Sequence, residues 1–291
     1  MVYEIFLTSI DISTLLSFWY VLPIAIIIAS IAMIFGIGGA ILFSPFFLIV
    51  LNLPPDMAIA LGLLIEVFGF SSGLIAYARN KLINYHLGTR ILPLTILAAL
   101  LGASLGKYIP SIILEITLAG VLFLLAIAFL QKEKTIIYTT LPLHPEENYE
   151  QVKKKWFDFW QDFKKSPTLF FASAIGGLLV GLVSTGLGEI NEYNFVKRLK
   201  MKNNLAAGTS VFIIAITALT ASIFNLSYFS AVNTKNLTTI VQIAIFAIPG
   251  VIIGAQLGVH FSKTIDQKKA LKTLPFLFII LGMITITKSM L

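Results

Sequence analysis

Two short glycine-rich segments carry the residue types in this sequence that can form a binding site. The first runs from Phe35 to Ala40 and reads FGIGGA, and the second runs from Ser184 to Glu189 and reads STGLGE. Each glycine in a helix interior costs about 1 kcal/mol relative to alanine, so both segments predict a broken helix. A break frees backbone N–H groups, and the helix that follows begins with a charge of about +0.5. Such a break can hold an oxyanion without lysine or arginine.

The predicted substrate-binding residues are the glycines of the two breaks and the hydroxyl side chains near them. They are Gly36, Gly38, Gly39, Ser44, Ser184, Thr185, Gly186, Gly188, Thr209 and Ser210. The alternative is that the glycines only let helices pack closely, as we expect for the small residues at Gly102–Gly106, Gly177–Gly181 and Gly250–Gly258. Because the two breaks occupy equivalent places in the two halves of the chain, we favour a binding site over packing.

Glu66 is the first of two carboxylates predicted to couple transport to an ion. It lies between Ile65 and Val67 in an apolar segment. An unpaired charge at such a position in a membrane costs at least about 2.5–3.5 kcal/mol. We therefore expect Glu66 to be protonated, or to be paired with a polar group such as Gln242 or Gln256.

Glu189 is the second coupling candidate, because it follows the second break directly. A carboxylate at this position can carry a proton or attract a cation. The nearby Glu192 and Lys197 leave a second interpretation open, in which Glu189 is an ordinary loop carboxylate at the cytoplasmic mouth.

The segments around these residues are those of a polytopic membrane protein. Apolar residues make up 57% of the chain, charged residues make up 12%, and the mean hydropathy is +0.92. Seven apolar runs outside the first glycine-rich stretch are each close to the roughly 20 residues that cross about 30 Å of hydrocarbon. They are Ala58–Ala78, Ile91–Tyr108, Ile112–Leu130, Leu169–Val183, Leu205–Leu226, Leu237–Phe261 and Leu271–Thr287.

Several function classes are not supported by the sequence. The net charge of +7 comes from lysines and arginines in short loops beside apolar runs, which indicates membrane orientation rather than nucleic-acid binding. The absence of cysteine excludes disulfides and thiolate metal sites. The histidines His86, His144 and His260 show no ligand spacing, and no catalytic triad order or phosphate-binding loop is present. We expect no enzyme activity, cofactor or metal.

The distribution of charge predicts the orientation. Residues 1–17 contain Glu4 and Asp11 but no lysine or arginine, so this tail is expected to be extracytoplasmic, and the Arg79–Arg90 loop is expected to be cytoplasmic. Residues 132–167 form a lysine-rich cytoplasmic linker. Tryptophans and phenylalanines recur there at helical spacing, which predicts an amphipathic helix on the membrane interface.

Residues 18–131 and 168–291 share one layout. We expect an all-α polytopic membrane protein with two inverted-topology repeats, each a glycine-broken helical hairpin followed by three transmembrane helices. The broken hairpins either cross the membrane twice or re-enter it. Gly102–Gly106 matches Gly254–Gly258, and Ala58–Gly62 occupies the place of Ala206–Ser210. Transporters built in this way bind substrate near the midplane, where the broken helices meet.

The order of these motifs resembles the sulfite exporter TauE/SafE family over nearly the whole chain from about Ile24. The resemblance is carried by Gly36–Gly39 with Pro45 and Pro54-Pro55, and in the second half by Gly181–Gly188, Ala206–Ser210 and Ile248-Pro249-Gly250. It implies a secondary active transporter in the cell membrane for small sulfur-containing anions such as sulfite, sulfonates or sulfoacetate. It also implies alternating access and coupling to protons or another ion.

Two alternatives to this interpretation stay open. One is a cation transporter that uses Glu66, Glu189 and Glu192. The other is a membrane receptor or scaffold that does not transport, and whose 131–167 loop binds a soluble partner. Two unwound helices argue against the scaffold, which has no reason to maintain them. The partners expected from the favoured interpretation are a small anion, a coupling ion and the lipid bilayer.

Overall fold

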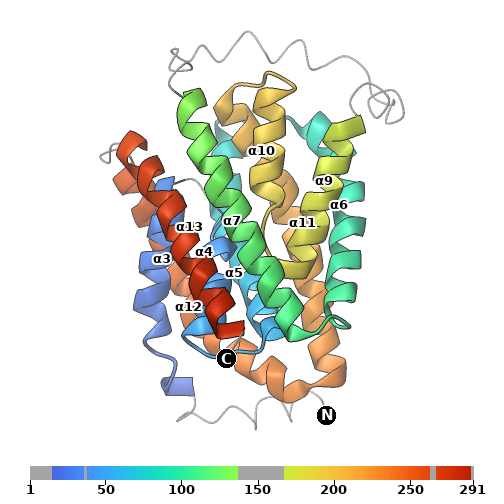
Figure 1. The fold of residues 1–291 in the computed structure, drawn as a ribbon, viewed down its shortest axis with the longest axis vertical. Coiled ribbons are helices and arrows are strands. Elements are labelled where there is room, and N and C mark those ends of the chain that lie inside the picture. Colours follow the sequence, from blue (N-terminus) through green and yellow to red (C-terminus); the bar gives the residue numbers. More distant parts are fainter. Residues whose placement is uncertain (1–14, 36–37, 137–166, 263–266, 290–291) are drawn as a thin grey trace.

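The computed structural model describes residues 15–35, 38–136, 167–262 and 267–289, which form ten helices and no β-strand (Figure 1). The amphipathic helix expected within the linker lies outside these residues. The helices are α3 (Val21–Phe35), α4 (Ala40–Ile49), α5 (Pro55–Arg79), α6 (Tyr85–Gly106), α7 (Ser111–Ile136), α9 (Pro167–Val183), α10 (Leu187–Lys197), α11 (Asn203–Val232), α12 (Thr234–Ser262) and α13 (Gln267–Ser289). The all-helical prediction is confirmed.

Within the described residues, five helices are long and apolar enough to cross a membrane. They are Pro55–Arg79, Tyr85–Gly106, Ser111–Ala128, Leu205–Val232 and Thr234–Gly258. The short helices α4 and α10 have 10 and 11 residues. At 1.5 Å per residue each is roughly 15 Å long, about half the hydrocarbon thickness. By length alone, neither α4 nor α10 can cross the hydrocarbon by itself.

Local sequence explains where several helices begin. Pro55 and Pro167 occupy the first positions of α5 and α9, where the missing N–H group has no helical partner to lose. Asn84 precedes α6, and its side-chain oxygen accepts a hydrogen bond from the backbone N–H of Leu87 at 3.0 Å. This N-cap fixes the start of α6 directly after the loop that follows α5.

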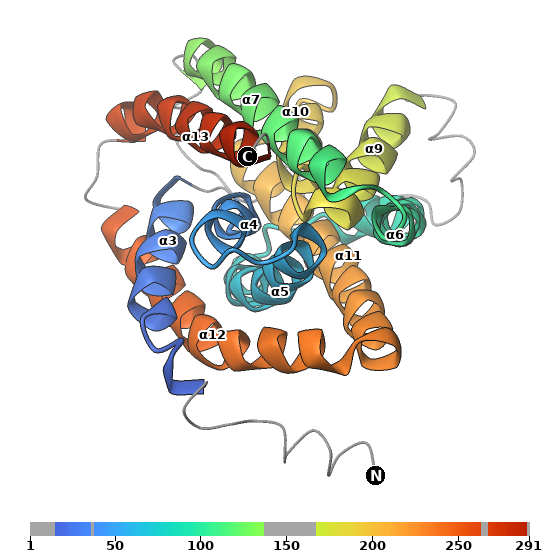
Figure 2. The same cartoon turned by 60° about the horizontal axis from the view of Figure 1, so that its bottom comes forward.

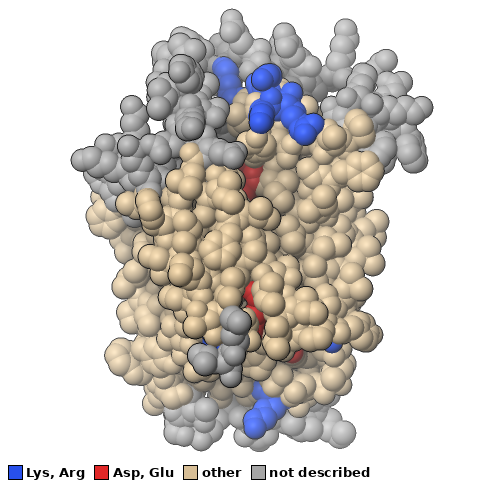
Figure 3. Space-filling model, viewed as in Figure 1, with Lys and Arg blue, Asp and Glu red and all other residues tan. Residues whose placement is uncertain are grey.

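Helix α5 lies in the middle of the bundle with α4 beside it (Figure 2). Its Ile65 packs into a buried cluster with residues of α3, α4 and α12, whereas its Leu63 packs with residues of α6, α9 and α11. On the face drawn in Figure 3, lysine and arginine atoms lie near the two ends, and the band between them shows no lysine or arginine and only small patches of Asp or Glu atoms. This distribution is what a multi-pass membrane protein requires.

Glycines bring two pairs of helices into backbone contact. A Cβ atom added to Gly254 of α12 would lie 2.4 Å from the carbonyl oxygen of Ile26 in α3. A Cβ atom added to Gly181 of α9 would lie 2.0 Å from the carbonyl oxygen of Ala99 in α6. No side chain fits in either place, so the packing role predicted for these small residues is confirmed.

We predict that Gly181→Ala and Gly254→Ala each destabilise the protein. The added methyl group meets a facing backbone, so the helices must separate, at a cost of about 1–3 kcal/mol. The measurement is the melting temperature of the detergent-purified protein. Gly120→Ala in α7 is the matched control, because a Cβ atom there meets nothing within 4 Å. Equal melting temperatures for all three variants would contradict the packing assignment.

Candidate functional site

Both glycine-rich segments break the helix, as the sequence predicts. Helix α3 ends at Phe35 and α4 begins at Ala40, with Gly39 as its N-cap residue. The second break lies between α9 and α10, where Ser184 has a φ of 58° and Gly186 a φ of 109°. A residue other than glycine at positive φ costs about 1–3 kcal/mol, so surrounding contacts must hold Ser184 in place. Gly36 lies outside the described residues.

The two breaks meet through a pair of hydroxyl groups. The Oγ atoms of Ser44 and Ser184 lie 2.6 Å apart in a hydrogen bond, and both residues are fully buried. Gly62 of α5 lies against this pair, because a Cβ atom there would be 2.5 Å from the Oγ of Ser44 and 3.1 Å from the Oγ of Ser184. Sequence reasoning did not assign Gly62 to the site. The sequence pattern that could have identified Gly62 is its position one helical turn before Glu66.

The two coupling candidates lie together beside Gly38. The backbone N–H of Gly38 donates a hydrogen bond to Oε1 of Glu189 at 3.3 Å. A Cβ atom on Gly38 would lie 3.0 Å from Oε1 of Glu66 and 3.4 Å from Oε1 of Glu189. Both carboxylates therefore reach the same point of the first break. Glu189 belongs to the first turn of α10, so it is not an ordinary loop carboxylate.

Glu66 is buried with 3% of its surface exposed, and its Oε2 atom makes no hydrogen bond to any described residue. The Gln256 amide, one of the two partners considered for Glu66, donates instead to the hydroxyl of Ser72 at 2.7 Å. Glu66 is thus a buried carboxyl group with one oxygen available to a ligand or a proton.

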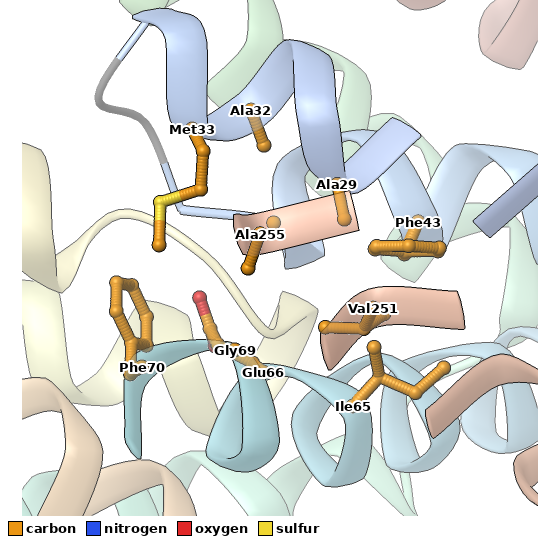
Figure 4. A pocket seen from close by; sticks show the side chains of 11 residues that line it. Ala29, Ala32, Met33, Phe43, Ile65, Glu66, Gly69, Phe70, Val251 and Ala255 are labelled. Carbon is orange, nitrogen blue, oxygen red and sulfur yellow. The ribbon is translucent and has the colours of Figure 1, made fainter. Parts of the chain in front are cut away.

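A small pocket adjoins Glu66 between α3, α4, α5 and α12. Among the described residues that line it, Glu66 alone is charged, and the other side chains are apolar. Figure 4 shows the Glu66 carboxyl oxygen pointing into the space between Met33, Phe70 and Ala255. The site therefore combines backbone and hydroxyl donors, two carboxylates and one apolar chamber.

The remaining predicted residues divide into two groups. The hydroxyl of Thr185 is buried without a partner among the described residues, so it is available at the second break. Ser210 supports that break by donating to the carbonyl oxygen of Gly188 at 2.7 Å. The hydroxyl of Thr209 donates to the carbonyl oxygen of Leu205 and accepts from the backbone N–H of Asn84 at 2.9 Å. Thr209 thus fixes the start of α6 rather than facing the two breaks.

Sequence reasoning also missed a lysine at the opposite end of α6 from the Arg79–Arg90 loop. The ammonium group of Lys107 lies 4.0 Å from the ring centre of Phe224 and 3.6 Å from that of Tyr228. Lys107 lines a small pocket together with Asn225, and burial lowers the pKa of Lys107. The sequence pattern that could have identified this contact is a single lysine in a turn, together with two aromatic residues four positions apart on α11.

We predict that Gly62→Ala disrupts the hydroxyl pair of Ser44 and Ser184 and lowers the stability of the protein. The new methyl group would lie 2.5 Å from the Oγ of Ser44, so it must displace that side chain. Adding Ser44→Ala removes the atom that clashes and should recover part of the melting temperature. The measurement is a double-mutant cycle on thermal stability, with an expected coupling of about 0.5–3 kcal/mol. Strictly additive effects would mean that Gly62 and Ser44 are not coupled.

Comparison with known proteins identifies a family that matches nearly the whole chain. The family model described as "Sulfite exporter TauE/SafE" matches residues 21–286. Neither a curated protein nor a solved structure matches the chain. The family match begins with α3 and extends to the last turn of α13, so it includes both glycine breaks and both carboxylates that meet at Gly38. This protein therefore belongs to the sulfite exporter TauE/SafE family of membrane transporters.

Proposed function

We propose that this protein moves a small sulfur-containing anion, of the sulfite, sulfonate or sulfoacetate class, across the cell membrane. The anion binds between the two glycine breaks. The observation that carries this proposal is the hydrogen bond between Ser44 and Ser184, which are 140 residues apart in the chain. It brings both breaks, and the backbone groups they free, to one buried place.

The donors at this place are dipoles rather than full charges. They are the amide of Gly38 and the hydroxyls of Ser44, Ser184 and Thr185. Helices α3, α4, α9 and α11 contain no charged residue at all. Backbone N–H groups at broken helices bind oxyanions by this means. A site of this kind favours a small anion whose oxygen atoms accept several hydrogen bonds.

Two inverted repeats, residues 18–131 and 168–291, would move around this site. Two observations support the assignment. Helix α3 packs on α12 through glycines, and α9 packs on α6 in the same way. The first helix of each repeat therefore packs on a helix of the other repeat, and these two partner helices are equivalent, as the symmetry of the repeats requires. If Ala58–Gly62 is equivalent to Ala206–Ser210, then Glu66 is equivalent to Ile214, and Ile214 lies against Gly188 as Glu66 lies against Gly38. Alternating access then follows from rocking one repeat against the other.

The end of the bundle that carries the Arg79–Arg90 loop would face the cytoplasm. The described basic residues at that end include Arg79, Lys81, Arg90, Lys197, Arg198, Lys200 and Lys202, and the lysines in the last part of α7 and the first part of α13 add to them. Those at the other end are Lys107, Lys235 and Lys288. The excess of positive charge supports a cytoplasmic location for the end that carries the Arg79–Arg90 loop. The start of α3 and the end of α13 would then lie near the outer surface (Figure 1).

We predict that sulfite, sulfoacetate or a simple alkyl sulfonate raises the melting temperature of the detergent-purified protein. A ligand at a hundredfold its Kd adds about 2.7 kcal/mol of stability. Gly38→Leu and Gly186→Leu should abolish this effect. The first fills the place where Glu66 and Glu189 converge, and the second puts a side chain at a φ of 109°. Gly120→Ala should respond like the wild type.

Cation transport is the second candidate, because two carboxylates converge on Gly38 and one oxygen of Glu66 has no described partner. The described residues contain no group of three His, Cys, Asp or Glu side chains that could hold a metal ion, so a proton or monovalent cation is the relevant ligand. If only cations raise the melting temperature, and Glu189→Gln removes that effect, the anion proposal is wrong and this candidate replaces it.

A further inference from the structure

The small pocket beside Lys107 lies at the end of the bundle opposite the Arg79–Arg90 loop, between α5, α6, α7, α9 and α11. The ammonium group of Lys107 is held between the rings of Phe224 and Tyr228, both on α11. Aromatic rings attract a positive charge, but they are weak hydrogen-bond acceptors. The three N–H donors of this ammonium group are therefore not used up by the two rings.

Asn225 is the second polar group of this pocket. Its side chain is 7% exposed and lines the pocket, and no hydrogen bond joins it to another described residue. A buried amide without a partner costs about 1–3 kcal/mol. The pocket is the place from which a ligand can supply that partner.

The charged groups around the pocket leave the charge of Lys107 without a carboxylate partner among the described residues. Asp56 also lines the pocket, but it is exposed in the first turn of α5, where the helix N-terminus stabilises its charge. Glu115 on α7 interacts with Lys288 at the end of α13. Lys235 is exposed in the first turn of α12, and the described parts of α9 and α11 carry no charged residue. None of these groups forms an ion pair with Lys107.

The pocket adjoins the hydroxyl pair of the proposed anion site. Its wall includes Ile59, which precedes Gly62 on α5 by three residues, or about 4.5 Å of helix. Gly62 in turn contacts both hydroxyl groups of the pair. On α9 the wall includes Gly181 and Leu182, and Ser184 follows two residues later at the second break. Two separate elements thus lead from the pocket to the breaks.

A further polar group lies one helical turn inward from Asn225. The side chain of Ser222 is 2% exposed, and its Oγ atom has no partner among the described residues. Residues three apart share one face of a helix, so the polar face of α11 continues from the pocket toward the middle of the bundle.

We propose that Lys107 and Asn225 form an outer anion site, which binds the oxyanion group of a sulfonate or of sulfite at the mouth of the path to the glycine breaks. This inference rests on the proposed function and adds a second stop to the same path. Lys107 supplies the charge, Asn225 supplies an N–H donor, and the two rings hold the ammonium group in place. Because the pocket is small, it suits the oxyanion group rather than a whole organic molecule.

Weak binding is what such a site requires. One half-buried lysine faces the exposed carboxylate of Asp56 across the same pocket, so the attraction for an anion is modest. Conduction and transport need a mouth that an anion can enter and also leave.

The test is protection of Lys107 from acetylation by acetic anhydride, followed by mass spectrometry of the purified full-length protein. Methanesulfonate should slow the modification of Lys107, because a bound anion covers the amine and keeps it protonated. Lys235 at the same end is the internal control and should not be protected. Chloride at equal ionic strength is the control for screening.

Three variants separate this site from the site at the breaks. Asn225→Leu should weaken the protection of Lys107 about fivefold or more, and Asp56→Asn should strengthen it, because a repelling charge is removed. Gly38→Leu, which fills the first break, should leave the protection unchanged. A purely structural role of Lys107 predicts none of these changes.

The outcomes distinguish the two proposals. If methanesulfonate raises the melting temperature but does not protect Lys107, or protects it no better than chloride does, this inference is wrong and the proposed function stands. Loss of protection in Gly38→Leu would also overturn the outer site. Protection by phosphatidylglycerol micelles alone would assign the pocket to a lipid headgroup and overturn it as a substrate site. If no sulfur-containing anion crosses the membrane of proteoliposomes, the proposed function fails, and the role of the pocket in transport fails with it.

Discussion

A backbone amide freed inside a membrane must find its acceptor within the protein, because lipid offers none. The amide of Gly38 finds the carboxylate of Glu189, which is 151 residues away in the chain. This one hydrogen bond depends on three larger features of the fold. It needs a break after α3, a second break before α10, and a bundle that brings both to the same depth. The hydroxyl pair of Ser44 and Ser184 fixes that alignment a short distance away.

The bundle separates a rigid frame from the short helices that carry the site. Backbone contacts at Gly254 and Gly181 join α12 to α3 and α9 to α6, and such contacts leave no room for sliding. Helices α4 and α10 are only 10 and 11 residues long and begin at the breaks. Because each is attached to a different half, the groups that we propose as substrate ligands lie at the junction that alternating access would have to change.

The sequence predicts the features that depend on local composition. Glycine clusters identify both breaks, and an isolated glutamate in an apolar run identifies Glu66. Contacts between distant segments are harder to predict from the sequence. Gly62 is needed because Ser44 and Ser184 converge on it, and no local pattern records that convergence. Thr209 resembles a site residue by type, yet the loop before α6 uses its hydroxyl as an acceptor. Tertiary packing decides both cases.

The apolar chamber beside Glu66 bears on the choice among sulfur-containing anions. An inorganic anion such as sulfite has oxygen atoms on all sides and would leave the walls formed by Ala29, Ala32 and Val251 without a partner. A sulfonate can place its oxygen atoms at the Gly38 amide and its carbon chain against those walls. Burial of apolar surface contributes about 0.8 kcal/mol per CH₂ group, which no polar donor at the breaks can replace. Affinity should therefore rise with the length of an alkyl sulfonate until the chamber is full, and a site built only for inorganic anions would show no such increase.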